Sequence, residues 1–359
     1  MMTWLFLALG LVLLVAGADI LVKGAARLAA SFGIPSLVVG LTVVAFGTSA
    51  PELAVSVKAA YAGEAELAIA NVVGSNIVNV LLILGLSAVV LPLTISRQLI
   101  RQDVPIMIGL SALLAYFVMD GSIGRSEALV FVIGLAAYTF FLFWQGKKQG
   151  VETVDDEVGD MLKEPHPLWQ NLLFVVIGLA LLVQGSSWMV DSAVQLATAW
   201  GISEAVIGLT IVAIGTSLPE LMTSVMAAIK GERDIAVGNV VGSNIFNILC
   251  VLGISGLVSP TPLLAGTQLA TLDIPVMLAV AVLCLPFFFA GATLNRLEGG
   301  LFLLAYAAYT WYLIALSLQH SYLADLQQGI VFGLIPVIGT YVVVALLLDL
   351  RKRKQGSVG

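Results

Sequence analysis

Two short motifs place oxygen-bearing side chains in an otherwise apolar sequence. GTSAPE runs from Gly47 to Glu52, and GTSLPE runs from Gly215 to Glu220. The hydroxyl and carboxylate groups of each motif lie within about one helical turn, so their oxygens can converge on one side. The proline has no N–H, so a backbone carbonyl one turn earlier loses its helical partner. Such hard oxygen atoms are the ligands that Ca²⁺ and Na⁺ prefer. The candidate ligands are Thr48, Ser49, Glu52, Thr216, Ser217 and Glu220.

The same residues have a second interpretation. Ser-x-Pro-Glu is also typical of a helix N-terminus, with a capping hydroxyl, a proline in the first turn and an acid near the positive end of the dipole. A single copy fits both interpretations equally well. Two copies, each with a costly carboxylate in an apolar span, favour an ion site. Capping and ion binding are compatible with each other.

A second pair of motifs, VVGSNIVN and VVGSNIFN, supplies further oxygen atoms. In each, a serine and an asparagine lie four residues apart and share a helix face. We expect these residues to be ligands; they are Ser75, Asn79, Ser243 and Asn247. For Asn71, Asn76, Asn239 and Asn244, hydrogen bonding between helices is the simpler role. Gly74 and Gly242 are expected to let helices approach closely.

Charge and composition narrow the chemistry of this site. Glu52 and Glu220 together carry about −2, which neutralises one Ca²⁺ or two Na⁺. Mg²⁺ fits less well because it loses its water reluctantly. Cys250 and Cys284 lie in apolar spans and are expected to be buried hydrophobic residues, and both histidines lie in polar connections. No GxxxxGK[ST] motif is present, which argues against an ATP-driven pump.

The elements that must position these residues are membrane-spanning helices. Of 359 residues, 60% are hydrophobic and 11% are charged, against about 25% charged in a soluble domain. A span needs roughly 20 apolar residues. Eleven such segments are predicted, at 3–26, 36–61, 66–91, 104–119, 126–145, 168–198, 204–229, 234–258, 272–292, 298–317 and 327–349.

The chain contains an internal repeat. Residues 37–90 align with 205–258 without a gap, with 32 identities in 54 positions. Weaker matches pair DVP at 103–105 with DIP at 273–275, and AAYT at 136–139 with AAYT at 307–310. The repeated unit has five spans, and an odd number inverts the second copy, as in many secondary transporters.

We therefore expect an all-α integral membrane fold with inverted five-helix repeats, which form a ten-helix core, plus one extra C-terminal transmembrane helix. The expected divisions are a first repeat at 1–146, a cytoplasmic linker at 147–167, a second repeat at 168–317, and the extra helix with a basic tail at 318–359. With the N-terminus outside, 14 of the 16 basic residues lie inside and only Lys58 and Arg125 lie outside. Because cytoplasmic loops accumulate Lys and Arg, we expect a multi-pass plasma (inner) membrane protein with a cytoplasmic C-terminus.

These motifs together resemble the two α-repeats of the sodium/calcium exchanger family, within the cation/calcium antiporters. The resemblance implies a central four-helix site that is exposed to each side in turn. It implies that the Ala45 and Ala213 carbonyls join the side-chain ligands already named. Some family members carry Asp where this chain has Asn79 or Asn247, so a K⁺-coupled mechanism is less favoured here. The eleventh span is outside the family's ten-helix pattern.

Other acidic residues have simpler explanations. Asp19 and Asp191 do not correspond in the repeat, and each is expected to pair locally or to face a water-filled entrance. Asp103 and Asp273 do correspond, and they stand at helix starts, where an acid interacts with the dipole.

The leading hypothesis is a Na⁺/Ca²⁺ antiporter that exports Ca²⁺, with Na⁺, Ca²⁺ and the lipid bilayer as its partners. It needs no cofactor, nucleic acid or obligatory protein partner. A proton-coupled antiporter of Ca²⁺ or another divalent cation is the alternative, and a passive cation channel is a weaker one. An enzyme is not expected, because no nucleophile–base or metal–histidine arrangement is present.

Overall fold

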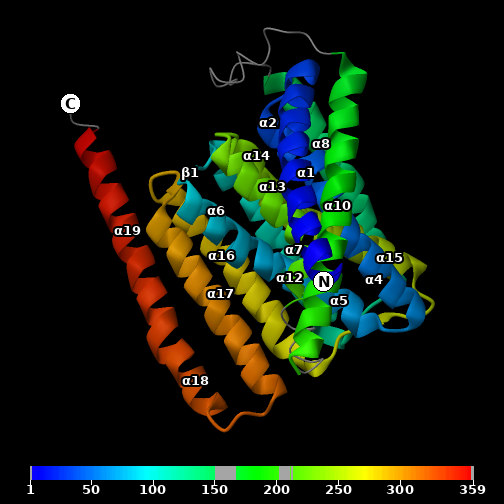
Figure 1. Cartoon of the computed structure of the whole chain (residues 1–359). Helices are drawn as coiled ribbons and strands as arrows, with labels where there is room; N and C mark the ends of the chain where they lie inside the picture. The colour runs from blue at the N-terminus through cyan, green and yellow to red at the C-terminus, as the bar shows by residue number, and fades with distance from the viewer. Residues whose placement is uncertain (1, 150–166, 202–210, 212, 357–359) are drawn as a thin grey trace.

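The apolar segments form helices, because inside a bilayer a helix satisfies its backbone hydrogen bonds within one segment. The computed structural model describes residues 2–149, 167–201, 211 and 213–356 (Figure 1). In these ranges, nine helical segments are long and apolar enough to cross a membrane. They are Met2–Phe32, Ala65–Val90, Leu99–Asp120, Arg125–Lys148, Leu168–Ala199, Arg233–Val258, Leu269–Phe289, Arg296–Ser317 and Leu323–Arg351.

A tenth span is bent at the first GTSxPE motif. Ser36–Thr48 and Ala50–Ala62 meet at an angle of 46°. Ten of the eleven predicted spans are therefore present as helices. The remaining prediction, 204–229, falls partly outside the described residues, and its second half forms two helices, Ala213–Thr216 and Leu218–Ile229.

Several spans change locally from α-helical to π-helical turns, which often occur at functional positions. The π-helical turns are labelled η, except that η4 is a 3₁₀ turn. The first half contains α1 (Met2–Phe32), α2 (Ser36–Val39), η1 (Gly40–Val44), α3 (Ala45–Thr48), α4 (Ala50–Ala62), α5 (Ala65–Val78), η2 (Asn79–Leu84), α6 (Gly85–Val90), β1 (Leu93–Thr94), η3 (Leu99–Asp103), α7 (Val104–Phe117), η4 (Val118–Asp120), β2 (Ser122–Ile123) and α8 (Arg125–Gln149). The second half contains α10 (Leu168–Ala199), α12 (Ala213–Thr216), α13 (Leu218–Ile229), α14 (Arg233–Phe246), η6 (Asn247–Leu252), α15 (Gly253–Val258), β3 (Leu263–Leu264), η7 (Leu269–Asp273), α16 (Ile274–Phe289), β4 (Thr293–Leu294) and α17 (Arg296–Ser317), followed by α18 (Leu323–Gly329), η8 (Ile330–Leu334) and α19 (Ile335–Gly356).

Two small β-pairings, which the sequence did not predict, join the halves. β1 pairs antiparallel with β4, and β2 pairs antiparallel with β3. Each pair takes one strand from each repeat, so the two connections are related by the internal pseudosymmetry. The all-α prediction is otherwise confirmed, and these two-residue strands lie between spans.

Glycines bring α1 and α10 together. The two helices run side by side (Figure 1), and Gly10, Gly17, Gly178 and Gly185 lie at their contact. A Cβ atom at Gly178 would lie 2.7 Å from the backbone nitrogen of Leu21, so only glycine fits there. Small residues at a helix contact let backbones approach closely in membranes.

The helices that carry the GSNxxN motifs lie at the centre of the protein. In the most apolar 18-residue stretch of each helix, 78% of the residues are buried in Ala65–Val90 and 89% in Arg233–Val258, against 6% in Leu323–Arg351. The last helix, α19, lies at the outer edge beyond α17 (Figure 1). Its Tyr341 donates a hydrogen bond to Glu298 of α17 at 3.2 Å. The extra C-terminal helix is therefore peripheral to the polar centre.

Candidate ion-binding site

Each GTSxPE motif forms a break between two short helices. Ser49 lies between α3 and α4 with φ −80° and ψ 8°, and Ser217 lies between α12 and α13 with φ −89° and ψ 9°. Pro51 and Pro219 occupy the first turn of the following helix. The break is expected from a proline that lacks an N–H, and it exposes polar backbone and side-chain groups inside the protein.

The serine hydroxyls do not cap these helices. Neither Ser49 nor Ser217 makes a side-chain hydrogen bond to the helix that follows it. Instead, the Ser49 hydroxyl donates to Glu220 Oε1 at 3.0 Å, and the Ser217 hydroxyl donates to Glu52 Oε1 at 3.2 Å. The helix-cap interpretation of these two serines is therefore wrong. Their hydrogen bonds join the two repeats crosswise.

Two asparagines brace the broken helices from the neighbouring spans, as the sequence predicted. Asn71 donates from Nδ2 to the Glu52 carbonyl at 3.2 Å and to Ser56 Oγ at 2.9 Å. Asn239 makes the equivalent bonds, to the Glu220 carbonyl at 3.3 Å and to Ser224 Oγ at 2.9 Å. Sequence reasoning did not single out Ser56 and Ser224. A signal was available, because each lies four residues after its glutamate in both repeats.

Thr48 and Ala45, two further predicted ligands, are fully buried next to this centre. Thr48 donates to Asn239 Oδ1 at 3.1 Å and lies 3.4 Å from the Ala45 carbonyl. The Ala45 carbonyl also accepts from the Ser49 N–H at 3.0 Å. In the second half, the Ser217 N–H donates to the Ile214 carbonyl at 3.1 Å.

Seven of the thirteen buried side-chain oxygens that make no hydrogen bond within the described residues belong to predicted ligands. In the described part of the chain, these atoms accept and donate no hydrogen bond: Glu52 Oε2, Ser75 Oγ, Asn79 Oδ1, Thr216 Oγ1, Glu220 Oε2, Ser243 Oγ and Asn247 Oδ1. Leaving a buried polar atom unpaired costs about 1–3 kcal/mol. Repeating that cost in both halves is typical of a site that binds a ligand through these atoms.

The donor set fits a hard cation. It consists of carboxylate, hydroxyl and amide oxygens, and it includes neither sulfur nor imidazole. Among the described residues, no group of three or more His, Cys, Asp and Glu side chains could hold a metal ion. The arrangement is therefore unlike a zinc centre, and it can bind Na⁺ or Ca²⁺ through oxygen.

The prediction that a glycine lets two helices approach closely at this site is confirmed for Gly242. A Cβ atom at Gly242 would lie 2.8 Å from both the Ala45 Cβ and the Leu41 backbone. A Cβ atom at Gly74 would meet no atom of the described residues within 4 Å. The residue equivalent to Leu41 is Leu209, which lies outside the described residues, so the expectation for Gly74 stays a prediction.

The weak sequence matches outside the motifs also meet in space. Tyr138 donates to Asp103 at 3.2 Å, and Tyr309 donates to Asp273 at 2.8 Å. Both spans begin about one turn earlier, at Leu99 and Leu269, through the π-helical turns η3 and η7, so the expectation that these aspartates stand at helix starts is wrong. Each carboxylate instead links two spans of its own repeat through a tyrosine.

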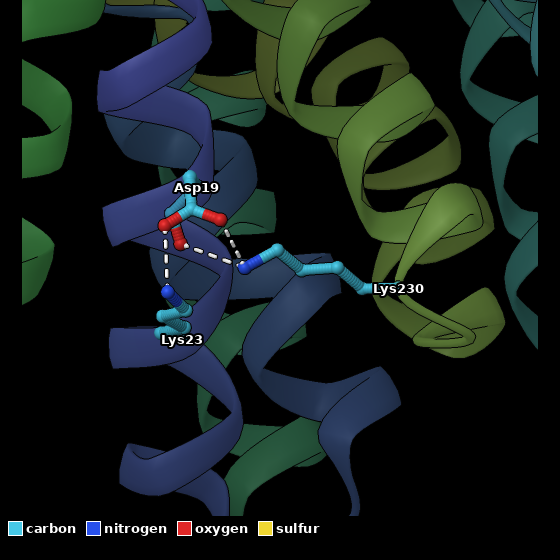
Figure 2. Close-up of polar contacts among 3 residues, drawn as sticks. All are labelled: Asp19, Lys23 and Lys230. Carbon is cyan, nitrogen blue, oxygen red and sulfur yellow. Dashed lines mark hydrogen bonds and ion pairs between the residues drawn. The ribbon is translucent and has the colours of Figure 1, made fainter.

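Asp19 pairs locally, as expected, and also contacts the other repeat. Figure 2 shows its carboxylate between Lys23 of the same helix and Lys230, the residue after α13. The nitrogen–oxygen distances are 2.8 Å to Lys23 and 2.5 Å to Lys230. Lys230 also donates to the Asp19 backbone carbonyl at 3.3 Å.

Comparison with known proteins agrees with the fold and shows the family. The sequence profile of the sodium/calcium exchanger protein family matches residues 2–144 and 170–315. The sodium/calcium exchanger MaX1 of Methanosarcina acetivorans is 35% identical over 340 residues, covering 85% of this chain and 97% of that protein. The inner membrane protein YrbG of Escherichia coli is 39% identical over 284 residues, covering 77% of this chain and 86% of that protein.

Solved structures agree as well. The sodium-calcium exchanger NCX_Mj, soaked with Na⁺ and Sr²⁺, superimposes with a TM-score of 0.74 at 31% sequence identity. The match covers 88% of this chain and 97% of that chain. The likeness extends over nearly the whole of the solved protein, so it includes both repeats.

Proposed function

Because the chain belongs to the sodium/calcium exchanger family, we propose that it is a secondary active antiporter that exchanges Na⁺ for Ca²⁺ by alternating access. The observation that carries this proposal is the crossed pair of hydrogen bonds from Ser49 to Glu220 and from Ser217 to Glu52. These bonds bring two carboxylates from opposite repeats to one buried centre. Interrupted helices that meet near the midplane are where secondary transporters bind their substrates.

In this proposal the unpaired oxygens replace the water shell of the transported cation. Both glutamates remain ionised when a cation is bound, and the hydroxyls and amide oxygens complete the coordination. The proposed ligands are the carbonyls of Ala45 and Ala213 with the side chains of Thr48, Ser49, Glu52, Ser75, Asn79, Thr216, Ser217, Glu220, Ser243 and Asn247.

Competition for these oxygens couples the two ion movements. One Ca²⁺ or two Na⁺ neutralise the two carboxylates, so a site filled with both kinds of ion would hold excess positive charge. Excess charge in a buried site is costly because the surroundings screen it poorly. Na⁺ that enters the site from the side to which it is open therefore displaces Ca²⁺ to that same side, and the site then carries Na⁺ back across the membrane, without ATP.

The charge distribution of the sequence supports an orientation. We place the N-terminus outside and the C-terminus in the cytoplasm, with Lys23 and Lys230 on the cytoplasmic side. We assign the repeats to 1–146 and 168–317. We assign the protein to the plasma (inner) membrane, because its relative YrbG is named an inner membrane protein. The inward Na⁺ gradient then drives Ca²⁺ export.

Flux through proteoliposomes tests this function. Vesicles are loaded with Na⁺ and diluted into Na⁺-free buffer that contains radioactive Ca²⁺, with the pH clamped equal on both sides. We expect Ca²⁺ uptake that requires the Na⁺ gradient and stops when monensin dissipates that gradient.

The same preparation separates the alternatives. Uptake driven by a pH gradient, with none driven by Na⁺ at clamped pH, would contradict Na⁺ coupling and would favour the proton-coupled antiporter. Unitary single-channel currents would contradict exchange altogether. Empty liposomes and vesicles that contain the Glu52→Gln variant serve as the controls.

A further inference from the structure

Four asparagines form a reciprocal hydrogen-bond network between the two repeats. Asn79 Nδ2 donates to Asn244 Oδ1 at 2.9 Å, and Asn247 Nδ2 donates to Asn76 Oδ1 at 3.0 Å. All four side chains are at most 2% exposed. The two bonds are equivalent under the internal pseudosymmetry, so the same arrangement occurs in both halves.

These bonds determine which end of each amide faces the ion site. A carboxamide has a carbonyl oxygen that attracts cations and an NH₂ group that repels them. With Nδ2 engaged across the repeat boundary, Asn79 Oδ1 and Asn247 Oδ1 stay without a partner in the described part of the chain. The reversed amide would place its NH₂ toward the cation and bring two carbonyl oxygens together.

The orientation of the network is anchored by backbone atoms that cannot be reversed. Asn76 Nδ2 donates to the Asn244 carbonyl at 3.3 Å, and Asn244 Nδ2 donates to the Asn76 carbonyl at 3.4 Å. Because a backbone carbonyl only accepts hydrogen bonds, each of these amides must direct Nδ2 toward it. Their Oδ1 atoms are then left to accept from Asn247 and Asn79.

We propose that Asn76 and Asn244 are positioning residues that align the ligands of the opposite repeat. Asn76 orients Asn247, and Asn244 orients Asn79, so each half prepares the other half's amide oxygen for the cation. The inference rests on the proposed function, because it takes Asn79 and Asn247 as ligands. It assigns Asn76 and Asn244 a part in ion affinity beyond interhelical packing.

A crossed set of double substitutions tests this assignment. Ca²⁺ binding to the purified full chain is measured in Na⁺-free buffer, with Ca²⁺ alone as the probe. We expect Asn76→Leu to weaken Ca²⁺ binding roughly tenfold, because it removes the acceptor for Asn247 Nδ2 and leaves that buried donor unpaired. The two oxygens of a carboxylate are alike, so Asn247→Asp removes the need for orientation.

The expected pattern is specific to the crossed pairs. In the Asn247→Asp background, Asn76→Leu should change Ca²⁺ affinity by less than about threefold, whereas in the Asn79→Asp background the roughly tenfold loss should remain. Asn244→Leu should show the opposite pattern. Equal losses in all backgrounds would overturn the inference and indicate a structural role, and equal suppression by either aspartate would indicate general charge compensation.

Thermal unfolding of the ion-free protein separates this inference from the proposed function. The crossed pair Asn76→Leu and Asn247→Leu should be more strongly non-additive in melting temperature than the same-helix pair Asn76→Leu and Asn79→Leu, whose members share the partner Asn244 but do not bond each other. If the unsubstituted protein binds no Ca²⁺ at all, the proposed function fails while the crossed network is still measured. If the crossed pairs are coupled in melting temperature but not in Ca²⁺ affinity, the network only holds the helices together and the positioning role is overturned.

Discussion

At the scale of single residues, the main feature is how each buried glutamate is supported. Glu52 and Glu220 are at most 1% exposed, and each accepts one hydroxyl hydrogen bond from the opposite repeat through Oε1. Their Oε2 atoms have no partner within the described residues. A carboxylate in an apolar span is costly, so this arrangement is consistent with a charge that a cation balances.

The two glutamates carry the first prediction. We expect Glu52→Gln and Glu220→Gln each to reduce Na⁺-driven Ca²⁺ flux by at least 100-fold, because the remaining single charge cannot balance Ca²⁺ in a buried site. Flux in proteoliposomes, normalised to the amount of reconstituted protein, measures the effect.

The matched control for this prediction is Glu64→Gln. Glu64 is exposed between α4 and α5, so its neutralisation should leave transport nearly unchanged. Near-normal flux in either buried variant would contradict the assignment of both glutamates as ligands.

At the scale of elements, the broken helices depend on tightly packed neighbours. The α1–α10 contact is built on glycines, where a Cβ at Gly10 would lie 2.8 Å from the Gly185 carbonyl. Asp19 of α1 adds ion pairs to Lys23 and, across the repeat boundary, to Lys230. These ion pairs join α1 to itself and to the end of α13, and partly exposed ion pairs contribute little, at most about 1 kcal/mol, so they are a weaker link than the close packing of α1 on α10.

The glycine contact yields a prediction about stability. Gly178→Ala should lower the stability of the protein by about 1–3 kcal/mol, because its Cβ would overlap the Leu21 backbone and force the helices apart. The shift in melting temperature, followed by intrinsic fluorescence in detergent, measures this effect.

Gly109→Ala is the control for replacing a helical glycine by alanine where no steric overlap results. Gly109 is an exposed residue of α7, and no atom of the described residues lies within 4 Å of a Cβ placed there. Alanine favours a helix over glycine, so this variant should melt no lower than the parent. Equal melting temperatures for the Gly178 variant and the parent would show that α1 and α10 tolerate a wider spacing.

At the scale of the whole molecule, the two inverted repeats make matching hydrogen bonds at the centre and differ from each other at the periphery. The hydrogen bonds of Glu52, Asn71, Asn76 and Asn79 recur at their equivalents 168 residues later. The Asp19–Lys230 ion pair has no counterpart, since an offset of 168 leads to Ser187 and Ala62. The final helix, α19, also stands outside the repeat.

The charge of the central site sets an expectation for the whole transporter. Two carboxylates balance one Ca²⁺ but need at least two Na⁺, so Na⁺ should drive Ca²⁺ uptake with a Hill coefficient above one. The measurement is the initial rate of Ca²⁺ uptake against internal Na⁺ at fixed ionic strength. A hyperbolic dependence would contradict binding of several Na⁺ ions at the glutamate pair.

Much of this organisation could be predicted from the sequence. Apolar length determines the number of spans, because a bilayer requires helices of about 20 residues. The repeat of the GTSxPE and GSNxxN motifs identified Glu52, Glu220, Asn79 and Asn247 as a matched set. An odd number of spans in each repeat predicted the inversion, and the proline positions predicted the breaks near Ser49 and Ser217.

Only the tertiary structure decided how these residues pair. The local motif alone fits Ser49 as a helix cap or as an ion ligand, and the packing of the two halves places its hydroxyl on Glu220 and not on the helix that follows it. The crossed partners of Asn76 and Asn244, the tyrosines that contact Asp103 and Asp273, and the pairing of Asp19 with Lys230 were likewise not predictable. Spacing along one helix reports which face a residue shares, but the partner across the pseudosymmetry axis depends on how the two repeats pack together.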